Sequence, residues 1–290
     1  MKKIKLLSIL MLVVMALPFM ISCSKDDDES NNGGSGGGSN ITVVVNDDGT
    51  TSNGSVFSAI DDKNFYLDYI KYSVKEDYLV VSGYDKAGFN GVAKIASRIT
   101  YKGYSYEVLK IYYSAFDGCS VLTSVTIPNS VTSILSRAFQ NCKKLTSVTI
   151  SNSVTTIGES AFHNCSGLTS ISIPNSVTYI ESYAFQNCSG LNSVTIPNSV
   201  TGIGQRAFDG TRLISLTIGN SVKGIGACAF LGCASLTEIH CLSPTPPQCN
   251  PYNNTFDDET FDATLYVPKG SLDAYRNKSP WNDFEHIVEE

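Results

Sequence analysis

The stretch Leu122–Cys142, LTSVTIPNSVTSILSRAFQNC, is followed by a near copy, Leu145–Cys165, LTSVTISNSVTTIGESAFHNC. The dipeptide Ala-Phe marks the same point of each copy and recurs with steps of 23, 23, 23, 23 and 22 residues. Its occurrences are Ala115-Phe116, Ala138-Phe139, Ala161-Phe162, Ala184-Phe185, Ala207-Phe208 and Ala229-Phe230. A fixed period in the twenties is typical of a solenoid, in which each unit buries its apolar face against its neighbours.

Each unit begins with a short alternation of apolar and polar residues. Val148 and Ile150 alternate with Ser147 and Thr149, which predicts a strand with one buried face. Equivalent strands would stack into a parallel sheet. The apolar residues over 154–161 have a roughly helical spacing. The sequence therefore predicts a repeat solenoid of 23-residue units, with a parallel sheet on one side and short helical or 3₁₀ turns on the opposite side.

We call a column the residues that share one position in successive units. One column holds Asn141, Asn164 and Asn187 and, in other units, Gly118, Gly210 and Gly232. Because Asn and Gly tolerate the left-handed backbone region, this column predicts a turn with positive φ, and a ligand-binding Asn is the alternative. A second column is predicted to bond backbone groups where the strand turns: Asn129, Asn152, Asn175, Asn198 and Asn220.

A third column contains cysteines, at Cys119, Cys142, Cys165, Cys188 and Cys233. Stacked coils lie about 4.8 Å apart with parallel side chains, whereas a disulfide needs Cβ atoms about 3.5–4.5 Å apart that approach one another. The column is therefore predicted to hold buried free thiols. The spacing leaves open a Cys241–Cys249 disulfide. It disfavours zinc at Cys228, Cys233 and Cys241, because paired C-x-x-C ligands are absent.

The outward positions of the predicted strands carry small hydroxyl side chains and almost no charge. They form a candidate binding face of twelve residues: Ser124, Thr126, Ser147, Thr149, Ser170, Ser172, Ser193, Thr195, Ser215, Thr217, Glu238 and His240. A merely solvated surface is the alternative interpretation, because Thr suits strands and the face lacks the Trp, Tyr and Arg that usually dominate protein interfaces.

The N-terminus has the layout of a secretory signal, with three lysines, an apolar run and small residues before Cys23. The run 6–21 is shorter than the ~20 residues that span a bilayer, so a retained anchor is a weaker alternative, as is plain secretion. Met-Ile-Ser before Cys23 resembles a bacterial lipobox, which implies a lipoprotein signal peptide over 1–22 and lipidation of Cys23. Residues 23–54, first acidic and then Gly/Ser-rich, are predicted to be a flexible tether.

Solenoid ends expose core and need caps. Residues 55–114 are predicted to form a β-rich N-terminal cap, with a hairpin at the stretch YKGYSYEV, 101–108. The repeats are assigned to 115–241. Residues 242–290 are predicted to form a mixed cap with a strand, a short helix capped by Ser271, and Trp281 and Phe284 against the last coil.

The spacing of Leu145, Val148 and Ile150 matches the L-x-x-L-x-L pattern of leucine-rich repeats. Leu122–Cys142 is similar to the repeat of the BspA-like leucine-rich repeat family of bacterial surface proteins, and the resemblance covers Leu109–Cys241. Some members are adhesins, so the resemblance implies binding of an extracellular or matrix protein. Together with the lipobox-like N-terminus, it implies a lipid-anchored protein of the outer membrane and cell surface. A glycan-binding or envelope-structural module is the alternative. The 22-residue unit predicts a local kink.

Composition and motifs give no case for an enzyme. With a net charge of −6 and 17 % charged residues, the chain lacks the basic stripe that nucleic acid requires. None of the three histidines lies in a nucleophile or metal motif, and no glycine-rich loop follows a strand. We therefore expect no catalysis, no cofactor, no metal and no nucleic-acid partner, and contact with the membrane only through the lipid.

Overall fold

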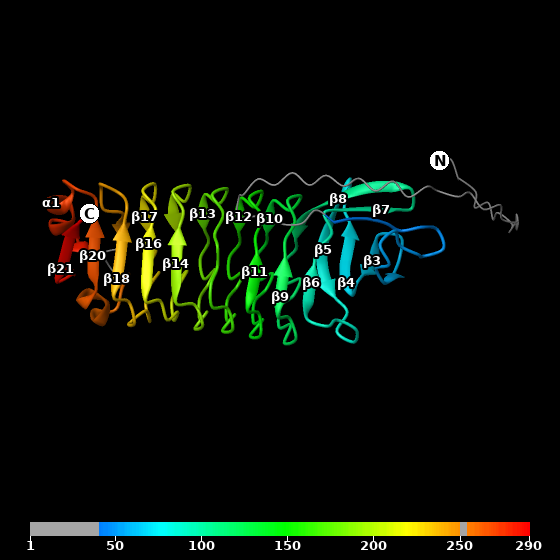
Figure 1. Ribbon diagram of the computed structural model, residues 1–290, viewed down its shortest axis with the longest axis horizontal. Coiled ribbons are helices and arrows are strands. Elements are labelled where there is room, and N and C mark those ends of the chain that lie inside the picture. The colour runs from blue at the N-terminus through cyan, green and yellow to red at the C-terminus, as the bar shows by residue number, and fades with distance from the viewer. Residues whose placement is uncertain (1–40, 250–253) are drawn as a thin grey trace, which may run out of the picture. The chain divides into compact units, whose positions relative to one another are not determined.

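The computed structural model describes residues 41–249 and 254–290, so the predicted signal peptide (1–22), Cys23 and most of the predicted tether lie outside the described residues. From about residue 90 onward the chain winds into coils stacked along one axis (Figure 1). An antiparallel β region precedes the stack, and short helices lie at its C-terminal end. The predicted repeat solenoid with parallel strands is confirmed.

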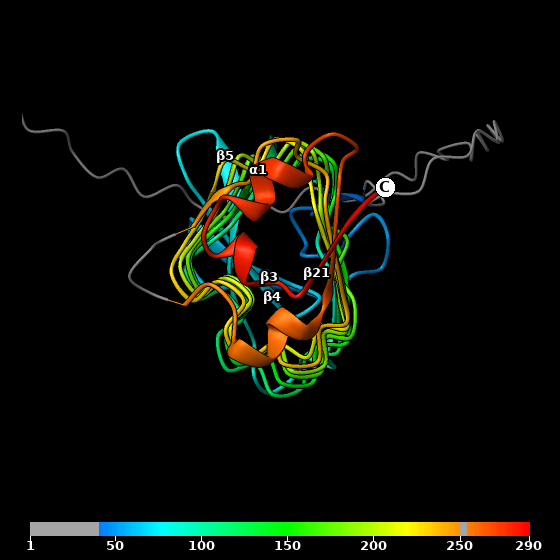
Figure 2. The same cartoon turned by 90° about the vertical axis from the view of Figure 1, so that its left-hand side faces the viewer.

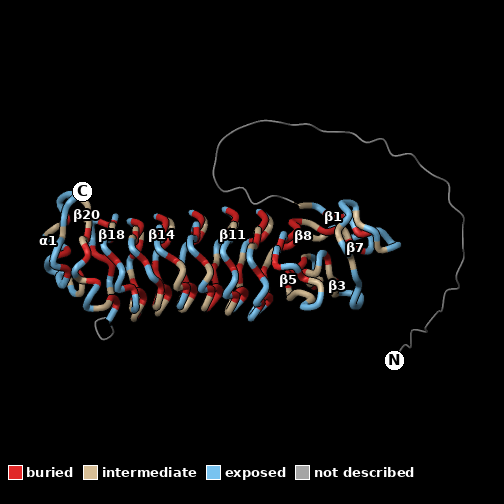
Figure 3. Tube along the Cα trace, turned by 60° about the horizontal axis from the view of Figure 1, so that its bottom comes forward, coloured by how far each residue is buried: buried red, intermediate tan, exposed pale blue. Residues whose placement is uncertain are grey.

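One wall of the solenoid, which we call the long-strand face, is built from the strands that the alternating pattern predicted. Three pair in parallel: β6 (Val92–Lys94), β9 (Ser124–Thr126) and β11 (Ser147–Thr149). Five more pair in parallel further along: β14 (Ser193–Ile196), β16 (Ser215–Ile218), β18 (Glu238–Cys241), β20 (Thr264–Val267) and β21 (His286–Glu289). Val125 and Leu216 point inward and are buried, and Figure 3 shows this alternation along the coils.

The opposite wall, the short-strand face, is a second parallel sheet. It begins with β8 (Tyr104–Ile111) and continues through two-residue strands, namely β10 (Ser133–Ile134), β12 (Thr156–Ile157), β13 (Tyr179–Ile180), β15 (Gly202–Ile203), β17 (Gly224–Ile225) and β19 (Gln248–Cys249). The structure differs here from the predicted helical turn over 154–161. Its β-branched residues adopt a strand that pairs with both neighbouring coils, and only isolated turns follow, such as the Ala161 amide donating to the Gly158 carbonyl at 3.1 Å.

A stack of phenylalanine rings runs through the core from coil to coil. Neighbouring ring centroids lie 5.2–5.6 Å apart and the rings are within 11° of parallel. The stack comprises Phe116, Phe139, Phe162, Phe185, Phe208, Phe230 and Phe256, all fully buried. Its last member lies beyond Cys241, so the coil geometry continues into the segment assigned to the C-terminal cap. Such aromatic pairs contribute about 0.5–1.5 kcal/mol each beyond burial of their area.

The predicted column of Asn and Gly lies in the turn that follows the Ala-Phe dipeptide of each coil. Asn141, Asn164 and Asn187 have φ of 57–60°, and the Gly members also have positive φ, which confirms the prediction. The Asn164 Nδ2 donates to the Asn141 Oδ1 at 2.8 Å, and the Asn187 Nδ2 donates to the Asn164 Oδ1 at 3.0 Å. These side chains therefore form a ladder of amides that joins successive coils.

The second Asn column behaves differently from the prediction. Only the Asn198 Oδ1 accepts a backbone hydrogen bond, from the Asn220 amide at 2.9 Å, among the column members in the described residues. The neighbouring serines bond backbone groups instead. The Ser176 hydroxyl donates to the Val154 carbonyl at 2.6 Å, and Ser199 makes the equivalent bond in the next coil. The Asn side chains of this column are exposed.

The cysteine column is buried, and its members are free thiols, as predicted. The Cys165 Sγ donates to the Phe139 carbonyl at 3.1 Å, and Cys142 and Cys188 make the same bond to the Phe of the preceding coil. Thr211 replaces a cysteine in the 22-residue unit, and its hydroxyl donates to the Phe208 carbonyl at 2.8 Å. The column thus packs small groups that also satisfy a buried carbonyl.

Because the cysteine column is buried, the stability of the fold should depend on pH in the alkaline range. It raises the pKa of Cys188 and of Cys233 from 9.0 to about 12, because the interior disfavours the thiolate. The stabilisation is complete below pH 9 and is lost as pH rises toward 12, because the unfolded chain releases these protons first. Between pH 9 and 11 the free energy of unfolding should therefore fall less steeply in the Cys188→Ala variant than in the parent chain. The two slopes should differ by about 1.4 kcal/mol per pH unit. Urea titrations at several pH values measure this slope, and equal slopes in both proteins would contradict the assignment.

The N-terminal region is β-rich and contains the predicted hairpin. β7 (Arg98–Tyr101) and β8 pair antiparallel, and β8 also joins β5 (Tyr78–Tyr84) to the first two-residue strand. β4 (Ile70–Val74), β3 (Asn64–Leu67) and β2 (Phe57–Ala59) continue from β5 as an antiparallel meander. β1 (Thr42–Val44) pairs with β7 although it lies inside the range expected for the tether. Its β-branched residues favour a strand, and Val43 is buried.

The C-terminal segment lies across the end of the stack, as the end-on view shows (Figure 2). It contains the 3₁₀ helix Asp258–Asp262, helix α1 (Leu272–Arg276) and the 3₁₀ helix Trp281–Asp283. Trp281 and Phe284 are buried as predicted. The Ser271 hydroxyl does not cap α1 but donates to the Pro268 carbonyl, while the Glu289 carboxylate accepts from the Gly270 amide at 2.9 Å.

Cys241 and Cys249, whose pairing the sequence left open, are both free thiols. Cys241 is buried, and the Tyr275 hydroxyl lies 3.0 Å from its sulfur and donates to the Ser243 carbonyl at 2.7 Å. The cysteine therefore packs against the helix of the cap. Burial raises its pKa to about 11.

Candidate binding face

The twelve residues of the candidate binding face lie on the long-strand face, and all but Ser170 and Ser172 belong to strands. Ser124 and Thr126 stand in register with Ser147 and Thr149. In the larger sheet two rows run in register, Ser193, Ser215 and Glu238 in one and Thr195, Thr217 and His240 in the other. Their side chains are partly or fully exposed. The structure thus brings them together in two rows of a common wall.

The character of the face changes at its C-terminal end. The His240 ring stacks on Tyr266 of β20 with centroids 4.6 Å apart, and its Nδ1 lies 3.0 Å from the Glu290 carboxylate. Glu238 adds a second acid. The hydroxyl rows therefore end in an aromatic and acidic border. Tyr266 was missed as a face residue because its strand was assigned to the cap, although its alternation Thr264–Val267 signals an outward position.

The long-strand face is interrupted at the coil Cys165–Asn187. In the intact part, the Thr146 amide donates to the Thr123 carbonyl of the preceding coil at 2.9 Å. The equivalent amides of Thr169 and Asn192 make no such bond, although both lie within the described residues. Consequently β11 and β14 are edge strands in the middle of the solenoid.

The interruption is confined to this wall. On the short-strand face Tyr179 pairs with Thr156 on one side and with Gly202 on the other. The rings of Phe162 and Phe185 also stay stacked, 5.4 Å apart. The coil therefore remains in the stack while its long-strand segment, 170–173, loses both neighbours.

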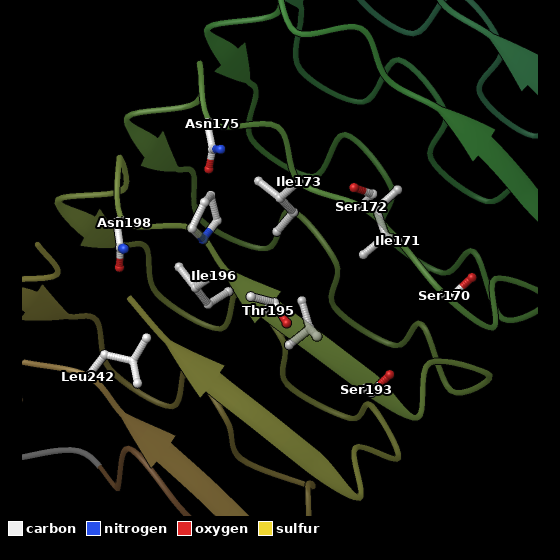
Figure 4. A pocket seen from close by; sticks show the side chains of 12 residues that line it. Ser170, Ile171, Ser172, Ile173, Asn175, Ser193, Thr195, Ile196, Asn198 and Leu242 are labelled. Carbon is white, nitrogen blue, oxygen red and sulfur yellow. The ribbon is translucent and has the colours of Figure 1, made fainter. Parts of the chain in front are cut away.

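A groove of about 430 Å³ lies at this interruption (Figure 4). It is bounded by segment 170–173, by β14 and by the residues that follow each of them. Ile171 and Ile173 are 8 % and 7 % exposed, whereas the equivalent Leu216 and Ile218 are completely buried. At the interruption these apolar side chains are thus slightly accessible to solvent, as is Val148 of the other edge strand, β11.

The lining of the groove is uncharged. Hydroxyls come from Ser170, Ser172, Ser193 and Thr195, which sequence reasoning placed on the face. Asn175, Asn198 and Leu242 also line it and were missed as site residues. Leu242 carries a signal in the sequence, because an apolar residue replaces the Pro or Gly found at this position in most other units, as at Pro197 and Gly219.

Chemically, the face offers neutral donors and acceptors together with apolar contacts. Among residues 41–249 and 254–290, no group of three His, Cys, Asp or Glu side chains is arranged to hold a metal ion. The pKa of His163 is lowered, first by burial and then by Arg137, and this ring lies at a turn of the solenoid and not on the face.

Comparison with known proteins agrees with this geometry. The sequence pattern described as BspA type Leucine rich repeat region matches residues 107–242 in six copies. Residues 107–242 form a BspA type leucine-rich repeat region. No curated protein sequence matches the chain. In the part of the chain that the structure covers, no helix is long and apolar enough to cross a membrane.

Among crystal structures of similar fold, two have more than a quarter of their aligned residues identical to those of this leucine-rich repeat protein. The T. pallidum Leucine Rich Repeat protein is 28 % identical with a TM-score of 0.54, over 60 % of this chain and 84 % of its own. A leucine rich cell surface protein from Faecalibacterium prausnitzii is 29 % identical with a TM-score of 0.51, over 73 % and 72 %. Leucine-rich repeat solenoids of this kind are generally not catalytic. The name of the F. prausnitzii protein places that protein at the cell surface.

Proposed function

We propose that this protein is a lipid-anchored surface protein that presents its long-strand face to proteins outside the cell. The observation that carries the proposal is the wall of neutral hydroxyl side chains held in register by the two parallel sheets. The cell-surface description of the F. prausnitzii relative and the lipobox before Cys23 support the location. Direct contact with the membrane is made by the lipid alone.

The location is tested by adding protease to intact cells that express the full chain. A surface protein is degraded on intact cells, whereas a protein on the inner side is degraded only after lysis. Labelling with a radioactive fatty acid checks the anchor, and a Cys23→Ala variant should lose the label. Survival of the protein on intact cells would overturn the proposed location.

The binding role is tested by exposing cells that display the full chain to immobilised matrix proteins and mucins. The triple variant Thr149→Asp, Ser172→Asp and Thr195→Asp places three charges on the face and should abolish capture. A matched control puts the same charges on the exposed residues Thr155, Thr178 and Thr201 of the same three coils, on the opposite wall. Equal capture by both variants would exclude the face, and binding to a glycan array alone would replace the protein partner by a glycan.

A further inference from the structure

The long-strand face has a step where its hydroxyl rows end, near the C-terminal end of the stack (Figure 1). One row of register partners passes through Thr195 and Thr217. It continues into His240, Tyr266 and Val288 of β18, β20 and β21. Neighbours in such a row lie about 4.8 Å apart and point to the same side of the sheet. Large side chains therefore rise beside a floor of small hydroxyl side chains.

The ring of His240, which forms the wall of the step, is held from two sides. It stacks on Tyr266 with the two planes 8° from parallel, and its Nδ1 lies 3.0 Å from the Glu290 carboxylate. The Glu290 amide donates to the Val267 carbonyl at 3.0 Å, which fixes the backbone that carries this acid. Because Tyr266 covers the face toward β20, the other face of the imidazole is turned toward β16 and Thr217. The His240 side chain is 28 % exposed, so the wall is fixed and accessible.

The charge around the step is negative. Glu238 is exposed and is the register partner of Ser215, and it points to the same side of β18 as His240, two residues further along. Glu290 supplies a second carboxylate beside the ring. The strands of this end, β16, β18, β20 and β21, contain no Lys or Arg. The step therefore combines planar rings with carboxylates that no cation of these strands neutralises.

An arginine side chain matches this arrangement, because its planar guanidinium stacks on aromatic rings and binds carboxylates through paired hydrogen bonds. Tyrosine and arginine often dominate protein interfaces, and Tyr266 is the one Phe, Tyr or Trp among the described strands of this wall. We propose that the partner protein places an exposed arginine in the step, against the His240 ring and paired with Glu238. The inference rests on the proposed function and names the chemistry of the partner and its main point of contact.

The hydroxyl rows then contact an uncharged part of the partner. Thr195 lies two strands from His240, about 10 Å away, which is close to the Debye length of ~8–10 Å at physiological salt. Carboxylates introduced at Thr195 or further along the face, as in the triple Asp variant, would lose water without gaining a counter-charge. A partner with an arginine in the step is therefore consistent with the loss of capture expected for that variant.

The repeat supplies variants that remove the step and keep the pattern of the coil. Glu238→Ser with Tyr266→Thr, which we call the step variant, introduces the Ser and Thr that these columns carry in the hydroxyl rows. The matched control, Glu159→Ser with Tyr179→Thr, removes the same charge and the same ring from exposed positions outside the long-strand face. The coil that precedes them also carries Ser and Thr at these two positions.

Peptides selected from a phage-displayed library against the full chain serve as the probe, and they should be enriched in arginine. A selected peptide should bind the step variant about tenfold more weakly than the parent chain, and the matched control less than about twofold more weakly. Citrulline in place of the peptide's arginine keeps the planar shape but removes the charge, and it should also cost about tenfold. Recovery of no peptide, recovery of arginine-free peptides alone, or indifference of the recovered peptides to either change would overturn the inference.

Capture of matrix proteins by cells that display the full chain separates this inference from the proposed function. Capture that the step variant weakens about tenfold, and that the matched control leaves intact, would support the step as the main contact. Capture that the triple Asp variant abolishes but the step variant leaves intact would keep the binding face and reject the step. Capture that neither variant changes would reject the long-strand face itself, and the step with it.

Discussion

The Phe162→Ala substitution is expected to lower the free energy of unfolding by about 3–5 kcal/mol, the range for removal of a buried aromatic ring. The Phe162 ring is fully buried and stacks on Phe139 at 5.2 Å and on Phe185 at 5.4 Å. Alanine leaves a cavity in the middle of the ring stack and removes both contacts. Urea unfolding followed by far-UV circular dichroism measures the change.

The control for this substitution is Tyr113→Ala, because the Tyr113 side chain is 56 % exposed and outside the core. It should change stability by no more than about 0.5 kcal/mol. In a solenoid each coil contacts only its neighbours, so the cavity should also weaken coupling between the two halves. A shallower or two-step transition is therefore expected for Phe162→Ala. An unchanged midpoint and slope would show that the ring stack does not hold the coils together.

The sequence was sufficient to predict the structure wherever a position in the coil accepts only certain residue types. Asn164 and Gly210 share a column because both accept positive φ, and the structure places them there at 60° and 70°. Leu168 and Cys165 are buried because a period of 23 residues repeats one inward pattern. These constraints are local or periodic, so they can be read from the sequence.

A second left-handed column was missed because its residue types carry no common signal. It comprises Ser114, Arg137, Ser160, Tyr183, Arg206 and Cys228, with φ of 52–61°. The left-handed conformation costs about 1–2 kcal/mol for such residues. It is stabilised by bonds between coils, such as the Ser160 amide donating to the Ser182 carbonyl at 3.0 Å. A constraint that arises from the neighbouring coil leaves the side chain free to vary.

The groove was missed for a related reason. Residues 168–173, LTSISI, differ little from 191–196, LNSVTI, yet the first segment forms no strand and the second forms β14. Strand pairing here depends on backbone bonds between adjacent coils, which the residue types of one coil do not determine. Strand pairing runs through the 22-residue unit without a break, from β14 to β16 and β18, and the kink expected there stays a prediction. The turn of this unit is one residue shorter because Arg212 stands in place of Ser189-Gly190, and the Thr211 hydroxyl donates to the carbonyl of Phe208 in its own coil.

The second large effect is expected at the C-terminal end of the stack, for Trp281→Ala. The Trp281 ring is fully buried against Phe256 and Tyr275, at 5.6 Å from each, and its Nε1 donates to the Pro247 carbonyl at 2.9 Å. Loss of the ring should cost about 3–5 kcal/mol and expose the last Phe of the ring stack. Urea unfolding gives the energy, and binding of a hydrophobic dye by the folded variant reports the exposed coil.

The Trp281→Phe variant separates packing from the hydrogen bond, because it keeps an aromatic ring but leaves the buried Pro247 carbonyl without its donor. That loss alone should cost about 1–3 kcal/mol. Dye binding should then stay near that of the parent chain. If Trp281→Ala were as stable as the parent and bound no dye, residues 242–290 would not be the cap. The coil stack would then have to end at Cys241 by another means, although β20, β21 and Phe256 continue its sheet and its rings.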